Sequence, residues 1–317
     1  MSKHLVEFQD QLLKSKKIVA LVGAGLSVSS GLPTFRGSQG LWKNYNQIDL
    51  ATPDAFYVDP GLVWQFYSWR RFEALKASPN RGHLALSKLS KMSKNCKLEN
   101  DEVEKLDIEY VTITQNVDSL LTRSGHCKQN LYELHGSLFD LRCTSFVCNY
   151  VEHNNLKHPL TSALKDCEYE YDSRPRKRKN DDIFKDEELI LSPQFTPVKE
   201  LDESDLPQCP ICKDGSILRP GVVWFGESLP LRIIDKIDNY IELGTPVDLI
   251  LVIGTSGTVY PANSYVDRIK LKGGKVAVFN TDIEPDILQG KVKNTWGFKG
   301  DAAEILPLAL KPLIGEL

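Results

Sequence analysis

A cluster of small residues near the N-terminus has the composition of a phosphate-binding turn. Residues 18–22 form a short apolar run that predicts a buried strand. The small residues that follow it are Gly23, Ala24, Gly25, Ser27 and Gly31. Such a turn lets backbone N–H groups approach a diphosphate closely. The G-x-G-x-x-G fingerprint is only partly matched, because Val28 stands at its third glycine. An ordinary strand-to-helix turn is therefore the alternative.

The loop that follows, residues 31–37, carries an aromatic and a cation. Phe35 and Arg36 lie between two glycines, and none of the loop residues favours a helix. A flexible segment with a guanidinium and an aromatic ring suits closure over an anionic ligand. The alternative is an ordinary surface loop with one buried Phe.

Two pairs of cysteines indicate a metal site. Cys143 and Cys148 form the first pair, and Cys209 and Cys212 form the second. Four thiolates satisfy a tetrahedral structural zinc with no open position. Four unrelated buried thiols are the alternative, and neighbouring side chains could replace Cys148 as a ligand. These neighbours are His153, His158 and Cys167. Because the N-terminus does not resemble a secretory signal, all seven cysteines are expected to be thiols or metal ligands rather than disulfides.

Predicted strands and helices alternate along most of the chain. The predicted core strands cover residues 18–22, 110–114, 131–134, 248–253 and 275–279, with a further apolar strand over 219–225. The predicted helices cover residues 61–77, 82–91, 235–243, 262–271 and 302–313. This alternation predicts an α/β fold with a doubly wound parallel sheet. Polar residues follow several strands, at the edge where open α/β sheets bind ligands.

The overall composition is that of an ordinary globular protein. The chain has 317 residues, a net charge of −3 and no apolar run of about 20 residues. No membrane partner is expected, and nucleic acid is not a favoured one. In the middle, 15 of the 23 residues from 166 to 188 are charged, so residues 166–205 are expected to include a disordered loop. Its basic cluster, residues 174–179, fits a solvated loop better than a nuclear address or a nucleic-acid patch.

Four ordered blocks resemble the sirtuins, which are NAD-dependent protein-lysine deacylases. The blocks are residues 23–37 (GAGLSVSSGLPTFRG), 114–118 (TQNVD), 133–137 (ELHGS) and 254–256 (GTS). The resemblance implies a Rossmann-like domain built from residues 1–142 and 216–317. It also implies a smaller inserted zinc-ribbon domain over residues 143–215, to which the helical segment around 51–93 contributes.

The resemblance also implies roles for individual residues. His135 would be the general base and Asn116 would assist it. NAD would contact Gly23, Ala24, Gly25, Ser27, Gly31, Phe35, Arg36, Trp42, Gln115, Asn116, Asp118, Gly254, Thr255, Ser256, Asn280, Asp282 and Ala302. The acylated substrate would contact Tyr67, Arg70, Val223, Phe225, Gly226 and Glu227. One structural zinc would be held by Cys143, Cys148, Cys209 and Cys212.

Within the family, residues 35–42 (FRGSQGLW), 49–56 (DLATPDAF) and 63–71 (VWQFYSWRR) resemble the branch that removes succinyl, malonyl and glutaryl groups. Its Tyr-x-x-Arg motif corresponds to Tyr67 and Arg70, so acyl-lysine proteins are the expected partners and acetyl a weaker substrate. An ordinary deacetylase and a mono-ADP-ribosyltransferase are the alternatives. The branch is often mitochondrial, but no clear presequence is visible, so cytoplasm and nucleus stay open.

Overall fold

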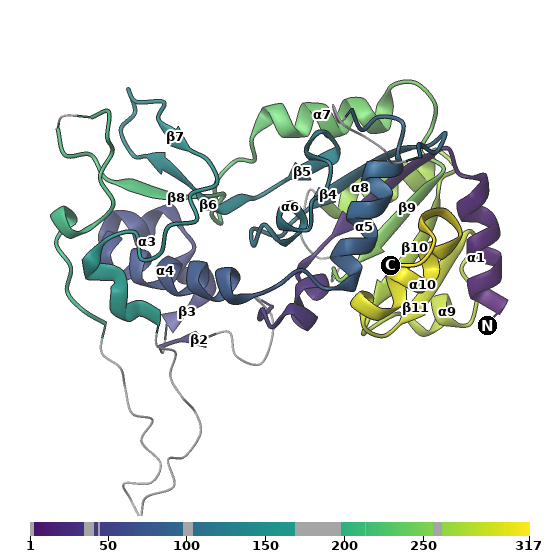
Figure 1. The fold of residues 1–317 in the computed structure, drawn as a ribbon, viewed down its shortest axis with the longest axis horizontal. Coiled ribbons are helices and arrows are strands. Elements are labelled where there is room, and N and C mark those ends of the chain that lie inside the picture. The colour runs from purple at the N-terminus through teal and green to yellow at the C-terminus, as the bar shows by residue number, and fades with distance from the viewer. Residues whose placement is uncertain are drawn as a thin grey trace, which may run out of the picture.

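The structure is a computed structural model, and it describes residues 3–34, 41–43, 45–97, 104–168, 198–212, 214–255 and 262–317. A large part built on a parallel sheet and a smaller part built on a short antiparallel sheet lie side by side (Figure 1). The chain crosses between them several times, because the small part draws its elements from three separate segments.

The large part contains a six-stranded sheet in which all neighbouring strands run parallel. In their order across the sheet the strands are β11 (Thr295–Lys299), β10 (Lys275–Asn280), β9 (Leu249–Ile253), β1 (Lys17–Val22), β4 (Glu109–Thr114) and β5 (Leu131–Glu133). The central strands β1 and β9 are apolar at almost every position and buried on both faces, as expected for strands covered on both sides.

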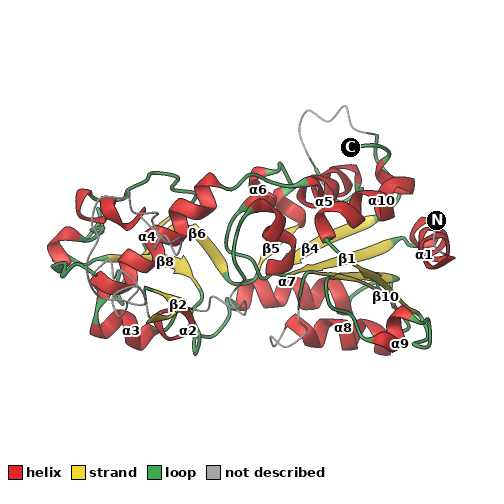
Figure 2. Ribbon diagram, turned by 90° about the horizontal axis from the view of Figure 1, so that it is seen from below, coloured by secondary structure: helices red, strands yellow, loops and turns green. Residues whose placement is uncertain are grey.

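Helices cover both faces of this sheet (Figure 2). One face packs against α1 (Lys3–Lys14), α5 (Arg81–Met92) and α10 (Ala302–Ile314). The other face packs against α7 (Leu231–Glu242) and α8 (Ala262–Leu271). Two single-turn helices, α6 (Leu120–Arg123) and α9 (Pro285–Leu288), contact α5 and β11 respectively. The predicted doubly wound parallel sheet is therefore confirmed.

The small part has a core of its own. Its antiparallel sheet has the order β7 (Val151–Glu152), β6 (Gly136–Cys143), β8 (Leu218–Val222). Beside it lie α2 (Gln47–Leu50), α3 (Pro53–Val58), α4 (Pro60–Lys76) and the short pair β2 (Leu41–Trp42) and β3 (Tyr45–Asn46). Aromatic side chains dominate this core, and many of them come from α4. The small sheet thus begins before residue 143 and continues after residue 215.

Local sequence explains where the helices of the small part and its junction begin. The Thr52 hydroxyl accepts from Ala55 N at 3.2 Å at the start of α3, and Asp59 Oδ1 accepts from Leu62 N at 2.8 Å at the start of α4. Asn80 and His83 form a capping box at the start of α5. Such side chains satisfy amide groups that the first helical turn leaves unpaired.

The sequence prediction for the middle segment is only partly testable. Residues 169–197, which carry most of the predicted disordered loop and its basic cluster, lie outside the described residues. Residues 198–205 make specific contacts. The Lys199 main chain donates to and accepts from the Gln65 side chain, at 3.1 and 2.9 Å, and Leu201 packs on the small core.

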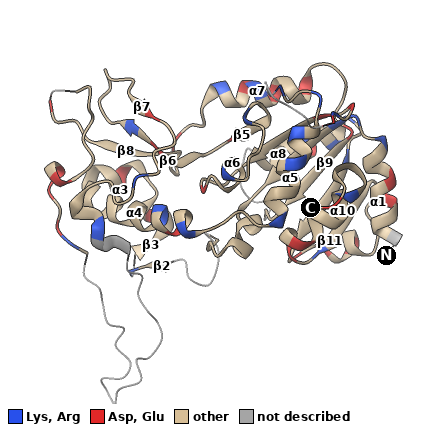
Figure 3. Ribbon diagram, in the orientation of Figure 1, with Lys and Arg blue, Asp and Glu red and all other residues tan. Residues whose placement is uncertain are grey.

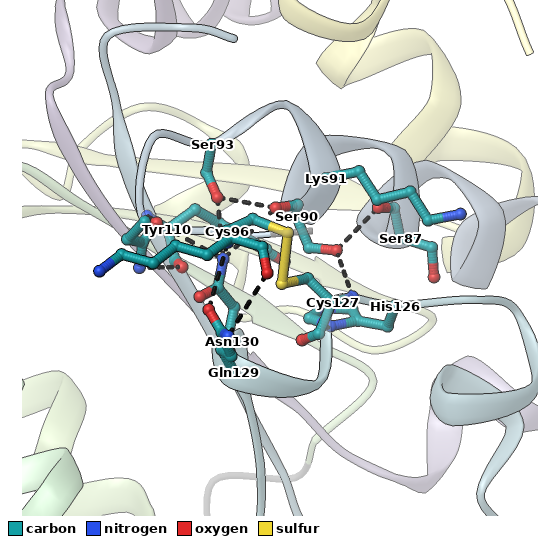
Figure 4. The surroundings of a disulfide bond; sticks show 12 residues. Ser87, Ser90, Lys91, Ser93, Cys96, Tyr110, His126, Cys127, Gln129 and Asn130 are labelled. Atoms are coloured by element: carbon teal, nitrogen blue, oxygen red, sulfur yellow. Dashed lines mark hydrogen bonds between the residues drawn. A yellow bond between two sulfur atoms is a disulfide. The ribbon is translucent and has the colours of Figure 1, made fainter. Parts of the chain in front are cut away.

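The prediction that no cysteine forms a disulfide is wrong for one pair. Cys96 and Cys127 are joined by a disulfide whose Cα atoms are 6.2 Å apart (Figure 4). The end of α5 brings them together, because Ser90 Oγ accepts from Cys127 N at 2.9 Å and Asn130 donates to Ser93 Oγ at 2.8 Å. The sequence argument considered compartment alone and could not place the two cysteines relative to each other.

No helix in the described part of the chain is long and apolar enough to cross a membrane. Lysine and arginine positions are intermixed with aspartate and glutamate along helices such as α7 (Figure 3).

Candidate functional site

Two glycine turns meet at the carboxyl ends of the central strands. Gly23 N donates to Ile253 O and Gly25 N to Gly254 O, both at 2.8 Å. A Cβ atom on Gly25 would lie 2.6 Å from Gly254 Cα, and Gly254 itself has φ +58°. Only glycine allows this approach of the two main chains. The turn after β1 is thereby held at the edge where parallel sheets bind ligands.

A single cleft runs from this edge into the small part. It has a volume of about 1720 Å³. Of the predicted NAD residues, it is lined by Gly23, Ala24, Gly25, Ser27, Gln115, Asn116, Asp118, Gly254, Thr255, Asn280, Asp282 and Ala302. It is also lined by His135 and by all six predicted substrate residues, Tyr67, Arg70, Val223, Phe225, Gly226 and Glu227. The structure therefore brings together residues from eight separate sequence segments.

Several predicted residues do not line the cleft or cannot be placed. Among the described residues, Gly31 ends the 3-10 helix after β1 with φ +90°, and Trp42 is buried in the small core against Phe66. Neither belongs to the cleft lining. Phe35, Arg36 and Ser256 lie outside the described residues.

Asn116, Ser27 and Asp118 form a directed chain of hydrogen bonds inside the cleft. Asn116 Nδ2 donates to Gly23 O at 3.1 Å and to Ser27 Oγ at 3.3 Å. The Ser27 hydroxyl donates to Asp118 Oδ2 at 2.6 Å, and Leu120 N donates to the other carboxylate oxygen. Burial raises the pKa of Asp118. These bonds fix three polar side chains where strands β1 and β4 end.

Side chains also link the carboxyl ends of β4, β9 and β10, with β1 lying between β4 and β9 in the sheet. Thr255 Oγ1, after β9, donates to Gln115 Oε1, after β4, at 3.1 Å. Asn280 Nδ2, at the end of β10, donates to Thr255 O at 3.0 Å. The far end of the cleft is thus a prearranged polar surface.

His135 lies between β5 and β6, at the junction of the two parts. Its Nδ1 is 2.9 Å from Gln115 O. A carbonyl oxygen can only accept, so Nδ1 carries the hydrogen and Nε2 has the lone pair. Burial lowers the pKa of His135, which keeps the ring neutral at pH 7. Neutral Nε2 is the atom that a general base requires.

Tyr67 and Arg70 lie one helical turn apart on α4 and line the same cleft. Tyr67 is 1% exposed, and its hydroxyl accepts a hydrogen bond from Trp224 Nε1 at 2.9 Å. The Arg70 guanidinium carbon lies 5.8 Å from the centre of the Tyr67 ring. Burial lowers the pKa of the Arg70 guanidinium, and the charge of Asp118 is among the interactions that oppose this shift. The small part therefore presents a partly buried cation and a buried phenol to the cleft.

The four predicted zinc cysteines converge. All four sulfurs lie within 4.8 Å of one another, with Cys143 and Cys212 at 3.6 Å and Cys148 and Cys209 at 3.9 Å. Four sulfurs placed about 2.3 Å from a tetrahedral zinc would be about 3.8 Å apart. The donor set and its spacing thus fit zinc, and Cys148 is one of the four converging cysteines.

Sequence reasoning passed over two residues at this site, Trp224 and Arg219. Trp224 stands between Val223 and Phe225, which were assigned to the substrate. Side chains alternate between the two faces along an extended chain, so the residue between two substrate positions is expected to be the more buried one. Trp224 is 3% exposed and Phe225 is 50% exposed. This alternation was the available signal. Its partner Tyr67 is 157 residues away in the chain and could not be predicted.

The fold and cleft define an α/β protein with a dinucleotide-type turn and a separate cysteine metal module. The family model described as "SIR2: Sir2 family" matches residues 23–261. The chain belongs to the Sir2 family.

Similar proteins extend this finding. An NAD-dependent protein deacylase of Candida albicans is 67% identical over the full length of both chains. The mitochondrial NAD-dependent protein deacylase sirtuin-5 of the dog is 37% identical over 98% of this chain and 86% of the relative. A solved structure of a Sir2 homologue with NAD matches with a TM-score of 0.68 and 33% identity, covering 97% of this chain and 93% of the other.

Proposed function

We propose that this protein removes acyl groups from protein lysines with NAD as co-substrate, and that it prefers acyl groups ending in a carboxylate. The products would be free lysine, nicotinamide and O-acyl-ADP-ribose, so the enzyme is a transferase of the acyl group. The names of its relatives support the NAD-dependent deacylase activity. A solved Sir2 homologue in complex with 2'-O-acetyl ADP-ribose supports the product.

The observation that carries the proposal is the position of His135 in one cleft with the glycine turn and with Tyr67 and Arg70. NAD would lie against the turn at Gly23–Gly25 and the loops after β4, β9 and β10. When bound, NAD supplies the ribose carbon that receives the acyl oxygen as nicotinamide leaves. Nε2 of His135 then takes a proton from a ribose hydroxyl, and the Gln115 carbonyl holds the ring in the required tautomer.

The segment Val223–Glu227 would hold the substrate peptide. Its own amides are already engaged, since Val223 N donates to His135 O and Phe225 N to Ala51 O, both at 2.9 Å. These two bonds hold the segment beside His135, so the two amides are not available to a peptide. A peptide placed along the segment can direct its acyl-lysine into the cleft. Peptide-bound structures are known for Sir2 proteins, including one with a p53 peptide and NAD.

The acidic acyl preference rests on Tyr67 and Arg70. A guanidinium can hold a carboxylate with two parallel hydrogen bonds, and the phenol can donate a third. An acetyl group offers no carboxylate to this partly buried cation, at a cost of about 1–3 kcal/mol. This corresponds to roughly tenfold to a hundredfold in selectivity.

Matched acetyl-, succinyl- and malonyl-lysine peptides test the proposal. Arg70→Met should lower kcat/KM for succinyl-lysine by roughly tenfold to a hundredfold and spare or raise it for acetyl-lysine. If Arg70→Met leaves the succinyl-to-acetyl ratio of kcat/KM unchanged, Arg70 does not read the carboxylate and the protein is an ordinary deacetylase. Nicotinamide release without free lysine would indicate ADP-ribosyl transfer.

The compartment belongs to the proposal as well. The dog and Xenopus tropicalis sirtuin-5 relatives are named as mitochondrial. By resemblance the same compartment is proposed for this chain, and fractionation of the tagged protein between mitochondria, cytoplasm and nucleus is the test.

A further inference from the structure

The Tyr67 hydroxyl is surrounded by donors. Trp224 Nε1–H donates to its oxygen at 2.9 Å. The Arg70 guanidinium, which can only donate, lies beside Tyr67, with its carbon 5.8 Å from the centre of the Tyr67 ring. The indole therefore occupies one acceptor position of the oxygen, and a second donor group lies close by. Burial raises the pKa of Tyr67, so the hydroxyl keeps its hydrogen, which must be directed at some other acceptor.

Trp224 is itself held in place by an ion pair. Arg219 Nη1 and Nη2 contact Glu227 Oε1 and Oε2 at 2.5 and 2.9 Å. Glu227 Oε2 also accepts from Trp224 N at 2.8 Å. The Arg219 guanidinium carbon lies 3.5 Å from the centre of the indole, a close cation–π stack. Main chain and ring of Trp224 are both fixed by the same pair.

The ion pair therefore controls how the Tyr67 hydroxyl is oriented. It fixes the indole, and the indole N–H takes one lone-pair position of the Tyr67 oxygen. This bond restricts the directions left for the other lone pair and for the hydroxyl hydrogen. Trp224 is 3% exposed and Tyr67 is 1% exposed, so water does not compete strongly for these positions. The cleft is where an incoming acceptor would be found, because both residues line it.

We propose that Trp224, clamped by Arg219 and Glu227, is a positioning residue for acidic acyl groups: its indole N–H orients Tyr67 so that the phenol donates to the acyl carboxylate. This inference rests on the proposed function. Trp224 acts through Tyr67, and its effect falls on acyl selectivity. An acetyl group has no carboxylate to receive the bond, so its turnover does not depend on the orientation of the hydroxyl.

Trp224→Phe tests the inference, because it removes the N–H and keeps an aromatic ring. We expect the succinyl-to-acetyl ratio of kcat/KM to fall about three- to tenfold, mainly through a higher KM for succinyl-lysine. Trp64→Phe is the matched control. Trp64 belongs to the same core, is fully buried, and donates its indole N–H to Leu218 O at 2.8 Å without lining the cleft. It should leave the succinyl-to-acetyl ratio unchanged.

A double-mutant cycle gives the sharper result. Once Tyr67→Phe has removed the hydroxyl, adding Trp224→Phe should lower the succinyl-to-acetyl ratio no further. Independent losses in the double variant would overturn the inference, and so would equal ratios in Trp224→Phe and Trp64→Phe. If Trp224→Phe does not fold, Glu227→Gln, which weakens the clamp, should shift the ratio in the same direction, and an unshifted ratio would overturn the inference.

The same data separate the two levels of the argument. A wild-type enzyme with no preference for succinyl-lysine overturns the acidic acyl proposal and this inference together. A wild-type preference that is lost in Tyr67→Phe but kept in Trp224→Phe overturns only the role of Trp224.

Discussion

At the scale of the residue, His135 shows how surroundings set a chemical role. Burial lowers its pKa below the ordinary value, and the bond to the Gln115 carbonyl only partly opposes this. In the proposed mechanism the neutral ring is the active base, and its fraction falls as the pH drops through the folded pKa. We therefore expect kcat/KM to be flat above pH 7 and to decline only below about pH 6.5. A pH profile of peptide turnover measures this, and a decline beginning above pH 7 would contradict it.

Removal of the same imidazole is the second test at this scale. His135→Ala should lower kcat by about 10²–10⁴-fold, the usual loss of a general base. NAD binding should remain measurable by calorimetry, because the glycine turn and the Asn116–Ser27–Asp118 chain are untouched. Near-normal turnover in this variant would remove His135 from the mechanism.

At the scale of the element, the strand that follows His135 depends on one glycine. Gly136 has φ +74°, and a Cβ atom there would lie 2.2 Å from Gly221 O on β8. Gly136→Ala should therefore reduce the free energy of unfolding by about 2 kcal/mol or more, through strain and displacement of β6. Gly315→Ala is the control, since φ is +67° there and nothing lies within 4 Å. Urea denaturation should show the larger loss at Gly136, and equal losses would contradict the clash.

A second prediction at this scale concerns the tie between α5 and the segment after α6. The Cys96–Cys127 disulfide closes a loop with a sequence separation of 31. Cys96→Ser should lower the free energy of unfolding by on the order of 3 kcal/mol in the chain-entropy account. Reductant should lower the melting temperature of the wild type toward that of the variant and leave the variant unchanged. A wild-type midpoint insensitive to reductant would argue against the bond in solution.

At the scale of the whole molecule, local patterns predicted more than long-range contacts. The parallel strands were predictable because strands buried on both faces are continuous apolar runs, as in Leu249–Ile253. Strand β6 contains Gly136, Asp140 and Arg142 as well as buried residues, and β11 contains Gly297, so neither strand is a continuous apolar run in the sequence. The cleft residues were predictable from their motifs.

Contacts between distant segments were not predictable from one sequence. The Trp224–Tyr67 bond joins residues 157 positions apart, and the disulfide joins residues 31 apart. Each depends on the packing of complete elements, which no local pattern records. The contacts among the four zinc cysteines are the exception, because two cysteine pairs predict a shared metal site even when a long insertion separates them.

The four zinc cysteines belong to the core that supports the acyl-binding side of the cleft. Cys209 is buried in the core that also contains Tyr67 and Trp224, and the other three cysteines pack against that core. The cores of the large sheet are separate from it. A structural zinc contributes folding free energy, so its loss should weaken the small part first.

We therefore expect one zinc per chain in the purified protein, and Cys209→Ser to lose it. Circular dichroism should retain most of the signal of the large sheet and its helices, while peptide turnover falls sharply, because α4 and the segment Val223–Glu227 lose their support. Cys96→Ser is the matched control, since it also replaces a buried cysteine by serine but lies outside the metal cluster. It should keep one zinc and its turnover at a temperature well below its melting point. A metal-free Cys209→Ser protein with full activity and an unchanged melting temperature would show that the small part holds its shape through its aromatic core alone.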